Sequence, residues 1–193
     1  MSQLRARDLG LAVGQLPTGQ RNKITDVPGV SVGHVTIDTC RYKTGLTAIL
    51  PCPENPFYHK LPAASVVLNG FGKSQGLVQV DELGQLESPI FLTNTLNVGK
   101  VHDGAVSWLL EQCGREGAPA RSVNPVVCEC NDGTLSDIGG RPVEAGHVLD
   151  YRISAFQKQI DEADQAIVES ISNRKDDLVA AYHVIRTLDW AGS

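Results

Sequence analysis

The stretch NPVVCECNDGTLSDIGGRPVEAGHVLD, residues 124–150, decides the fold class of this 193-residue chain. It opens with a short apolar run rich in β-branched residues, which is typical of a strand buried on both faces. Runs of the same kind stand at 64–68 and 89–93. Before residue 124, DGAVSWLLEQCG at 103–114 has the apolar spacing of a helix. Strands that alternate with helices predict a layered α/β domain.

The N-terminal third of the chain predicts two further strands. VSVGHVTI at 30–37 alternates apolar residues with small or polar ones, which is typical of a half-buried strand. GLTAIL at 45–50 predicts the next strand, and Pro51 ends it because proline has no backbone N–H for a ladder.

The C-terminal residues 151–193 differ in composition from the rest. Neither glycine nor proline occurs from 151 to 190, and the apolar residues step by three and four. This spacing predicts one long or two shorter amphipathic helices. We therefore divide the chain into a layered domain at 1–150 and a helical tail at 151–193.

Composition and charge are those of an ordinary globular protein. Hydrophobic residues make up 41%, charged residues 20%, and the net charge is −5 at pH 7. This balance disfavours a nucleic-acid partner, which needs clustered Lys and Arg, and no apolar run has the length of a membrane span. The N-terminus lacks the apolar run of a secretion signal and the five cysteines are scattered, so we expect a cytoplasmic protein.

No motif in the chain predicts a metal ion or a cofactor. Cys128 and Cys130 lie too close together for an ordinary zinc pair, and we expect both to be core thiols. Gly72-Lys73-Ser74 invites a phosphate-loop interpretation, but Val67 stands where such a loop needs its first glycine. We expect a flexible loop between a strand and a helix there.

Polar side chains stand where two predicted strands end. Asn94 lies within TNT at 93–95, and Asn131 lies within ECND at 129–132. Polar groups at strand ends border the crevice in which α/β proteins bind ligands, so both amides are candidate donors to a substrate carbonyl. The alternative is that they satisfy backbone groups in turns.

Four blocks carry a family resemblance. They are RNKITDVPGVSVGH (21–34), TGLTAILP (44–51), LESPIFLTNTLNVGKVHDGAVSW (86–108) and residues 123–150. In this order they resemble the L-aminopeptidase/D-Ala-esterase/amidase family, often called DmpA, which includes the β-peptidyl aminopeptidases. The resemblance covers about residues 1–150. It implies an αββα-type sandwich and a self-cleaving hydrolase whose new N-terminal serine is the nucleophile, with its own α-amino group as base.

The resemblance also implies roles for two residues. Glu87 lies near the position at which an acidic residue of the β-peptidyl aminopeptidases recognises the free amino group of the substrate; the alternative is a surface glutamate. His102 lies where the family often has a polar aromatic residue near the active site; the alternative is a structural histidine. With Asn94 and Asn131, these two complete the candidate substrate-binding residues.

The family's catalytic residues have no assigned counterpart in the chain. YRISAFQKQIDEADQAIV (151–168) replaces the Gly-rich segment that should follow GHVLD and carry the oxyanion asparagine, and no serine-led strand follows. Ser193 follows glycine, as the family's nucleophile does, but it is not expected to serve as one. We therefore expect an incomplete sandwich that is inactive alone. It would accept small peptides or amino-acid amides when a nucleophile-bearing chain complements it.

A non-catalytic alternative stays open for the same chain. It is a truncated or rearranged family member whose tail forms a helical oligomerisation surface, and a homo-oligomer is expected in either case. FQKQIDEADQAIVESISNR (156–174) also resembles, remotely, the first helix of AroQ-type chorismate mutases. Gln157 stands where that family has a catalytic arginine.

Overall fold

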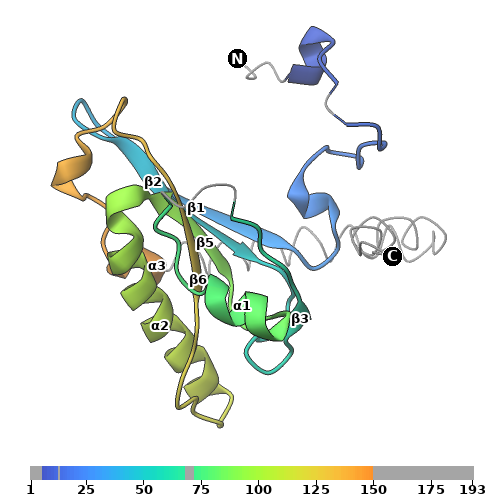
Figure 1. Cartoon of the computed structure of the whole chain (residues 1–193), viewed down its shortest axis with the longest axis vertical. Helices are drawn as coiled ribbons and strands as arrows, with labels where there is room; N and C mark the ends of the chain where they lie inside the picture. Colours follow the sequence, from blue (N-terminus) through green and yellow to red (C-terminus); the bar gives the residue numbers. More distant parts are fainter. Residues whose placement is uncertain (1–5, 13, 68–71, 150–193) are drawn as a thin grey trace.

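The computed structural model describes residues 6–12, 14–67 and 72–149 (Figure 1). The helical tail expected at 151–193, and Ser193 with it, lies outside the described residues. The strands are β1 (Ser31–Asp38), β2 (Lys43–Leu50), β3 (Leu61–Pro62), β4 (Gln85–Leu86), β5 (Ile90–Asn94) and β6 (Val126–Cys130). The α-helices are α1 (Leu77–Leu83), α2 (Val98–Arg115) and α3 (Gly146–Leu149), and the 3₁₀ turns are η1 (Ala6–Leu9), η2 (Ile24–Asp26), η3 (Thr95–Asn97) and η4 (Ile138–Gly140).

Four strands form one mixed sheet in the order β1-β2-β5-β6. β1 and β2 are an antiparallel hairpin, and β5 pairs antiparallel with β2. β5 and β6 are parallel, with α2 as the crossover between them, so that Asn94 lies opposite Cys130. β3 and β4 form a separate antiparallel pair.

One face of the sheet packs against α2 (Figure 1). Alternate strand residues such as Leu46, Ala48 and Phe91 are at most 2% exposed, as are Val101 and Ala105 of the helix. Burying a side chain of the size of Phe or Leu contributes about 1.5–3 kcal/mol, so this layer is the main source of stability.

The opposite face of the sheet is covered over only part of its width. Val80 of α1 and Leu86 of β4 pack on Val126 of β6. His34 and Thr36 of β1 are exposed on this face, with no described element above them. The α/β class is therefore confirmed. The second sheet of an αββα sandwich remains a prediction.

The predicted strand at 64–68 is wrong over its described residues. Residues 64–67 lie outside any strand, and Val66 and Val67 are 82% and 65% exposed. The neighbouring pair stops at Pro62, and Ala63 adds one backbone hydrogen bond to Gly84. A β-branched run favours a strand only where a partner backbone lies beside it.

The helix predicted at 103–114 is confirmed, but it begins earlier, at Val98. The chain enters it through η3, where the Asn94 side chain accepts a hydrogen bond from the Asn97 N–H. The strand end therefore passes directly into the helix, and Asp103 lies inside the helix instead of capping it.

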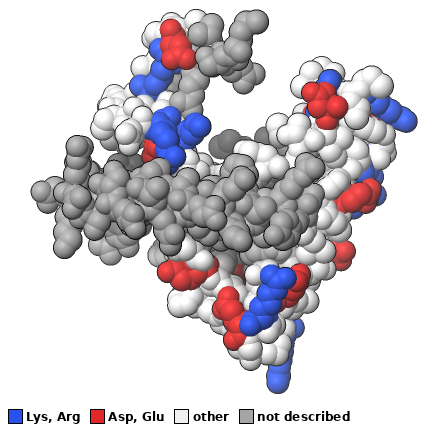
Figure 2. Space-filling model, turned by 180° about the vertical axis from the view of Figure 1, so that it is seen from behind, with Lys and Arg blue, Asp and Glu red and all other residues white. Residues whose placement is uncertain are grey.

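Charges on the described surface are mixed in sign. Figure 2 shows Lys and Arg side chains beside Asp and Glu side chains on the face turned to the viewer. The ion pairs Arg41–Asp137 and Lys100–Glu144 are two examples.

Candidate functional site

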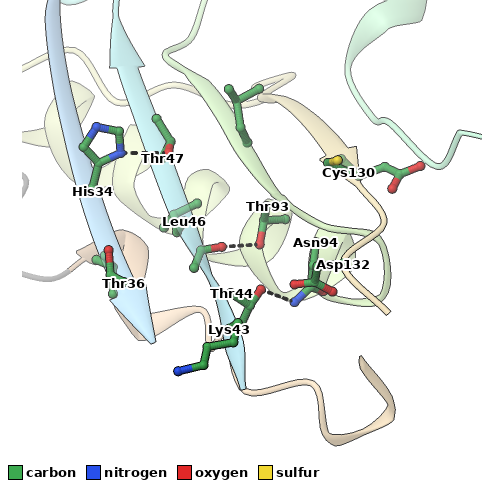
Figure 3. A pocket seen from close by; sticks show the side chains of 14 residues that line it. His34, Thr36, Lys43, Thr44, Leu46, Thr47, Thr93, Asn94, Cys130 and Asp132 are labelled. Carbon is green, nitrogen blue, oxygen red and sulfur yellow. Dashed lines mark hydrogen bonds between the residues drawn. The ribbon is translucent and has the colours of Figure 1, made fainter. Parts of the chain in front are cut away.

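The carboxyl ends of the parallel strands β5 and β6 meet at one edge of the sheet. A groove of about 450 Å³ begins there and runs over the uncovered face to β1 (Figure 3). Ligands of α/β proteins bind at such carboxyl ends, and the polar strand ends noted in the sequence lie in this region of the fold. The groove is lined by residues 34–36, 43–47, 92–94, 129, 130 and 132.

Asn94 lies in the groove wall and is 3% exposed. Its Oδ1 accepts the backbone N–H of Asn97 at 3.1 Å, and its Nδ2 donates to Thr44 Oγ1 at 2.8 Å (Figure 3). An amide NH₂ has two hydrogens, so one donor of Asn94 remains after the bond to Thr44. The turn and ligand interpretations of this residue are therefore compatible.

Two carboxylates line the same end of the groove. Glu129 is half-buried and accepts a hydrogen bond from the hydroxyl of Thr95. Asp132, two residues past the end of β6, has a buried Oδ1 with no hydrogen-bond partner among the described residues. A buried carboxylate oxygen without a donor is costly, and a cationic ligand group would satisfy it.

The other end of the groove is polar and lies on β1. His34 Nδ1 is 2.9 Å from Thr47 Oγ1 of the neighbouring strand, a pair visible in Figure 3. Thr36 points to the same face, because strand residues two apart share a face.

Glu87 is not a groove residue. It is 5% exposed and accepts hydrogen bonds from Lys60 Nζ (2.6 Å) and Gln79 Nε2 (2.9 Å). The N–H and Nδ2 of Asn124 donate to its other oxygen. Burial alone would raise the pKa of Glu87, but these donors outweigh it and hold the pKa below its ordinary value. The surface-glutamate alternative is wrong, and a substrate ammonium would have to displace Lys60.

His102 and Asn131 also lie outside the groove lining. His102 is half-buried on α2, where burial lowers its pKa and the charge of Asp103 offsets part of that effect. Asn131 is exposed, and its Oδ1 accepts the N–H of Gly133 at 2.9 Å, which is the turn role left open by the sequence. Of the four candidate residues, the groove contains Asn94 alone.

The sequence interpretation missed the groove carboxylates and misplaced one thiol. Glu129 and Asp132 were inside the ECND segment, but Asn131 was chosen from it. Cys130 is exposed and lines the groove, so the core-thiol expectation is wrong for it, while Cys128 is partly buried against the α1 cluster. Alternation along the strand was the available signal, since residues 128 and 130 share one face.

The described residues contain neither a metal-binding cluster nor a membrane-spanning helix. No group of three or more His, Cys, Asp or Glu side chains in this part of the chain could hold a metal ion. None of its helices has the length and apolar character needed to cross a membrane.

Known proteins match most of the chain. The model described as peptidase family S58 matches residues 22–167, extending past the limit of 150 seen in the sequence. Beta-peptidyl aminopeptidase BapA of Sphingosinicella xenopeptidilytica is 39% identical over 154 residues, which are 75% of this chain and 38% of that protein. BapA of Sphingosinicella microcystinivorans is 38% identical over 157 residues, with coverage of 75% and 37%. The chain thus spans under two fifths of the length of these relatives.

Three solved structures resemble the fold. The PH0078 protein of Pyrococcus horikoshii OT3 matches with a TM-score of 0.69 at 45% identity, covering 76% of this chain and 44% of that one. A β-aminopeptidase of Burkholderia sp. matches with a TM-score of 0.67 at 41% identity, covering 79% and 43%. The L-aminopeptidase D-Ala-esterase/amidase of Ochrobactrum anthropi, described as a variant of the Ntn-hydrolase fold, matches with a TM-score of 0.63 at 34% identity, covering 75% and 42%.

Proposed function

Because this chain belongs to peptidase family S58, the family of DmpA and the β-peptidyl aminopeptidases, we propose that it forms the amine-binding part of an aminopeptidase. The substrates would be small peptides or amino-acid amides with a free amino terminus. The observation that carries the proposal is the pair of carboxylates at one end of the groove, of which Asp132 has a buried oxygen without a hydrogen-bond partner among the described residues.

An ammonium group is the ligand that this end of the groove fits best. A carboxylate that accepts a hydrogen bond from an ammonium forms a charge-assisted bond, about twice as strong as a neutral one. Glu129 and Asp132 border the groove, whereas Glu87 is buried against Lys60. We therefore assign amine binding to Glu129 and Asp132 in place of Glu87.

The groove position also suits a sandwich of two sheets. In such a fold a second sheet lies about 10 Å above the first, and its inner face would cover β1 and β2. The groove would then lie between the sheets, with the amine at the ends of β5 and β6. The family's serine nucleophile would attack the substrate carbonyl from the opposite sheet, so we expect turnover only when a nucleophile-bearing segment is present.

The test is ligand binding by the purified chain. We expect alaninamide to shift the ¹⁵N–¹H resonances around residues 129–132 in an NMR titration, and N-acetylalaninamide, which lacks the ammonium, to leave them in place. Glu129→Gln should weaken alaninamide binding about tenfold or more, because it removes the charged acceptor. Glu82→Gln, an exposed carboxylate on α1, is the matched control. Equal affinity for the two ligands would rule out amine recognition here.

A further inference from the structure

The groove has two chemically different ends. Carboxylates border the end at β6, and His34 and Thr36 border the end at β1. Resting on the amine-binding role proposed above, we propose that the site takes short peptides with both termini free, and that His34 and Thr36 bind the substrate carboxylate. These two residues are then specificity-determining, since they separate peptides from amino-acid amides.

The sheet order sets the distance between the two ends. β1 and β6 are the outer strands of β1-β2-β5-β6, so three strand spacings separate them. At about 4.8 Å each, they place the backbones of Thr36 and Cys130 about 14 Å apart. Two or three peptide residues span about 7–10 Å when extended, and the side chains at each end take up the remainder. The groove therefore matches a dipeptide or a tripeptide.

The path between the ends crosses β2 at Gly45, which lines the groove. Thr36 pairs with Gly45 on β2, and the next strand along that row carries Asn94, opposite Cys130 on β6. Gly45 and Asn94 both line the groove, and Gly45 places no side chain in its middle. A ligand can thus lie across the strands from the carboxylates to β1.

The β1 end offers donors, whereas the β6 end offers acceptors. His34 Nδ1 is held by Thr47 Oγ1 at 2.9 Å, while no described residue bonds to Nε2. When the Thr47 hydroxyl donates to Nδ1, Nε2 carries a hydrogen and is a donor. The Thr36 hydroxyl is also without a partner among the described residues, and Lys43 at the rim adds an ammonium that is paired with Asp38. Donors of this kind suit the C-terminal carboxylate of a peptide. A C-terminal amide is neutral, so its hydrogen bonds to the same donors would not be charge-assisted.

NMR titration of the full chain with three ligands tests the inference. The ligands are alanyl-alanine, its C-terminal amide and its N-acetyl derivative. We expect the free dipeptide to bind about tenfold or more tightly than its amide, since one charge-assisted contact is lost. Thr36→Val and His34→Gln should each weaken binding of the dipeptide by a larger factor than binding of the amide, because only the dipeptide forms a charge-assisted contact there. His59→Gln, an exposed histidine outside the groove, is the control.

The outcomes separate this inference from the function on which it rests. If the amide binds as tightly as the free dipeptide while the N-acetyl derivative does not bind, carboxylate recognition is wrong and amine recognition stands. If the N-acetyl derivative binds as tightly as the free dipeptide, amine recognition is wrong. Binding of none of the three overturns both. Unchanged resonances of α2 and the buried face in each variant exclude misfolding as the cause.

Discussion

At the scale of the residue, the chain uses its carboxylates in two ways. Glu87 is buried with a full set of donors, whereas one buried oxygen of Asp132 has no donor in the part of the chain that the structure describes. A fully bonded carboxylate holds segments of the fold together, while one with free acceptor capacity is available to a ligand. Whether a carboxylate of this chain is a structural anchor or a candidate ligand-binding group therefore depends on how many of its hydrogen bonds are already made.

Replacing the buried carboxylate should destabilise the chain. We expect Glu87→Gln to cost about 2–4 kcal/mol at neutral pH, because it leaves Lys60 without a counter-charge. Lys60 is 34% exposed and can rehydrate in part, which keeps the cost within that range. Urea unfolding with an unchanged m value measures it, and Glu82→Gln is the control. A variant as stable as the parent would show that the pair is not a structural anchor.

The pH dependence of that cost has a definite sign. The pKa of Glu87 lies below its ordinary value of 4.5 in the folded state, so its ionised form stabilises the fold above that value. As the pH falls below 4.5 and through the folded pKa, this contribution is lost. The difference in unfolding free energy between parent and Glu87→Gln should therefore shrink with acidification, and a constant difference would contradict the shift.

Replacing Gly45 or Gly99 by alanine should change the stability of the fold in opposite directions. A Cβ on Gly45 would lie 2.1 Å from the carbonyl oxygen of Val35, so Gly45→Ala must push β1 away from β2. We expect a loss of about 1–3 kcal/mol. Gly99 lies in α2, and no atom of the described residues lies within 4 Å of such a Cβ, so Gly99→Ala should gain about 0.5–1 kcal/mol from helix propensity. Thermal unfolding of both variants compares them directly.

At the scale of the element, α2 connects the groove to the C-terminal end of the described chain. It follows the end of β5 through η3, and α3 packs on it. Asn97 Nδ2 and Lys100 Nζ bond to backbone carbonyls of Val143 and Arg141. The helix therefore fixes the segment at 141–149 against the strand end that borders the groove.

A single methyl group should loosen that contact. A Cβ on Gly104 would lie 2.4 Å from the carbonyl oxygen of Ala145 and 2.9 Å from a methyl carbon of Val148. We expect Gly104→Ala to increase amide hydrogen exchange over residues 143–149 while the protection of β2 and β5 stays close to that of the parent. Unchanged exchange at 143–149 would show that α3 does not depend on close approach to α2.

At the scale of the whole molecule, the N-terminal arm at residues 6–24 is a candidate interface for the expected homo-oligomer. All described residues from 6 to 24 are exposed, among them Leu9 (64%) and Leu16 (67%). Figure 1 shows this arm extending away from the sheet. Exposed apolar side chains on an arm favour association with another chain. The tail at 151–193, which the sequence predicted as an oligomerisation surface, lies outside the described residues.

We expect Leu9→Ser with Leu16→Ser to shift the chain from an oligomer toward a monomer in size-exclusion chromatography with light scattering. The far-ultraviolet circular dichroism spectrum of the monomer should stay that of the parent, because no described residue of the arm belongs to a hydrophobic cluster of the core. Leu83→Ser, an exposed leucine of α1, is the control. If the double variant has the same molar mass as the parent oligomer, the interface does not include the N-terminal arm.

The local elements of this protein could be predicted from its sequence. β-branched runs and alternation gave β1, β2, β5 and β6, and apolar spacing gave α2, because period and propensity are properties of neighbouring residues. The four blocks that resemble the aminopeptidase family could likewise be identified from the sequence alone. The region of the candidate groove could also be predicted from these elements, since the sequence shows polar residues at the ends of two strands.

Only the tertiary structure decided which residues share a site and which strands have partners. The parallel pairing of β5 with β6 put Asn94 opposite Cys130 and brought Glu129 and Asp132 into the groove. The same fold buried Glu87 against Lys60, 27 residues away in the chain. It also left Val66 without a partner strand. These outcomes depend on contacts between residues far apart in sequence, which local periodicity does not encode.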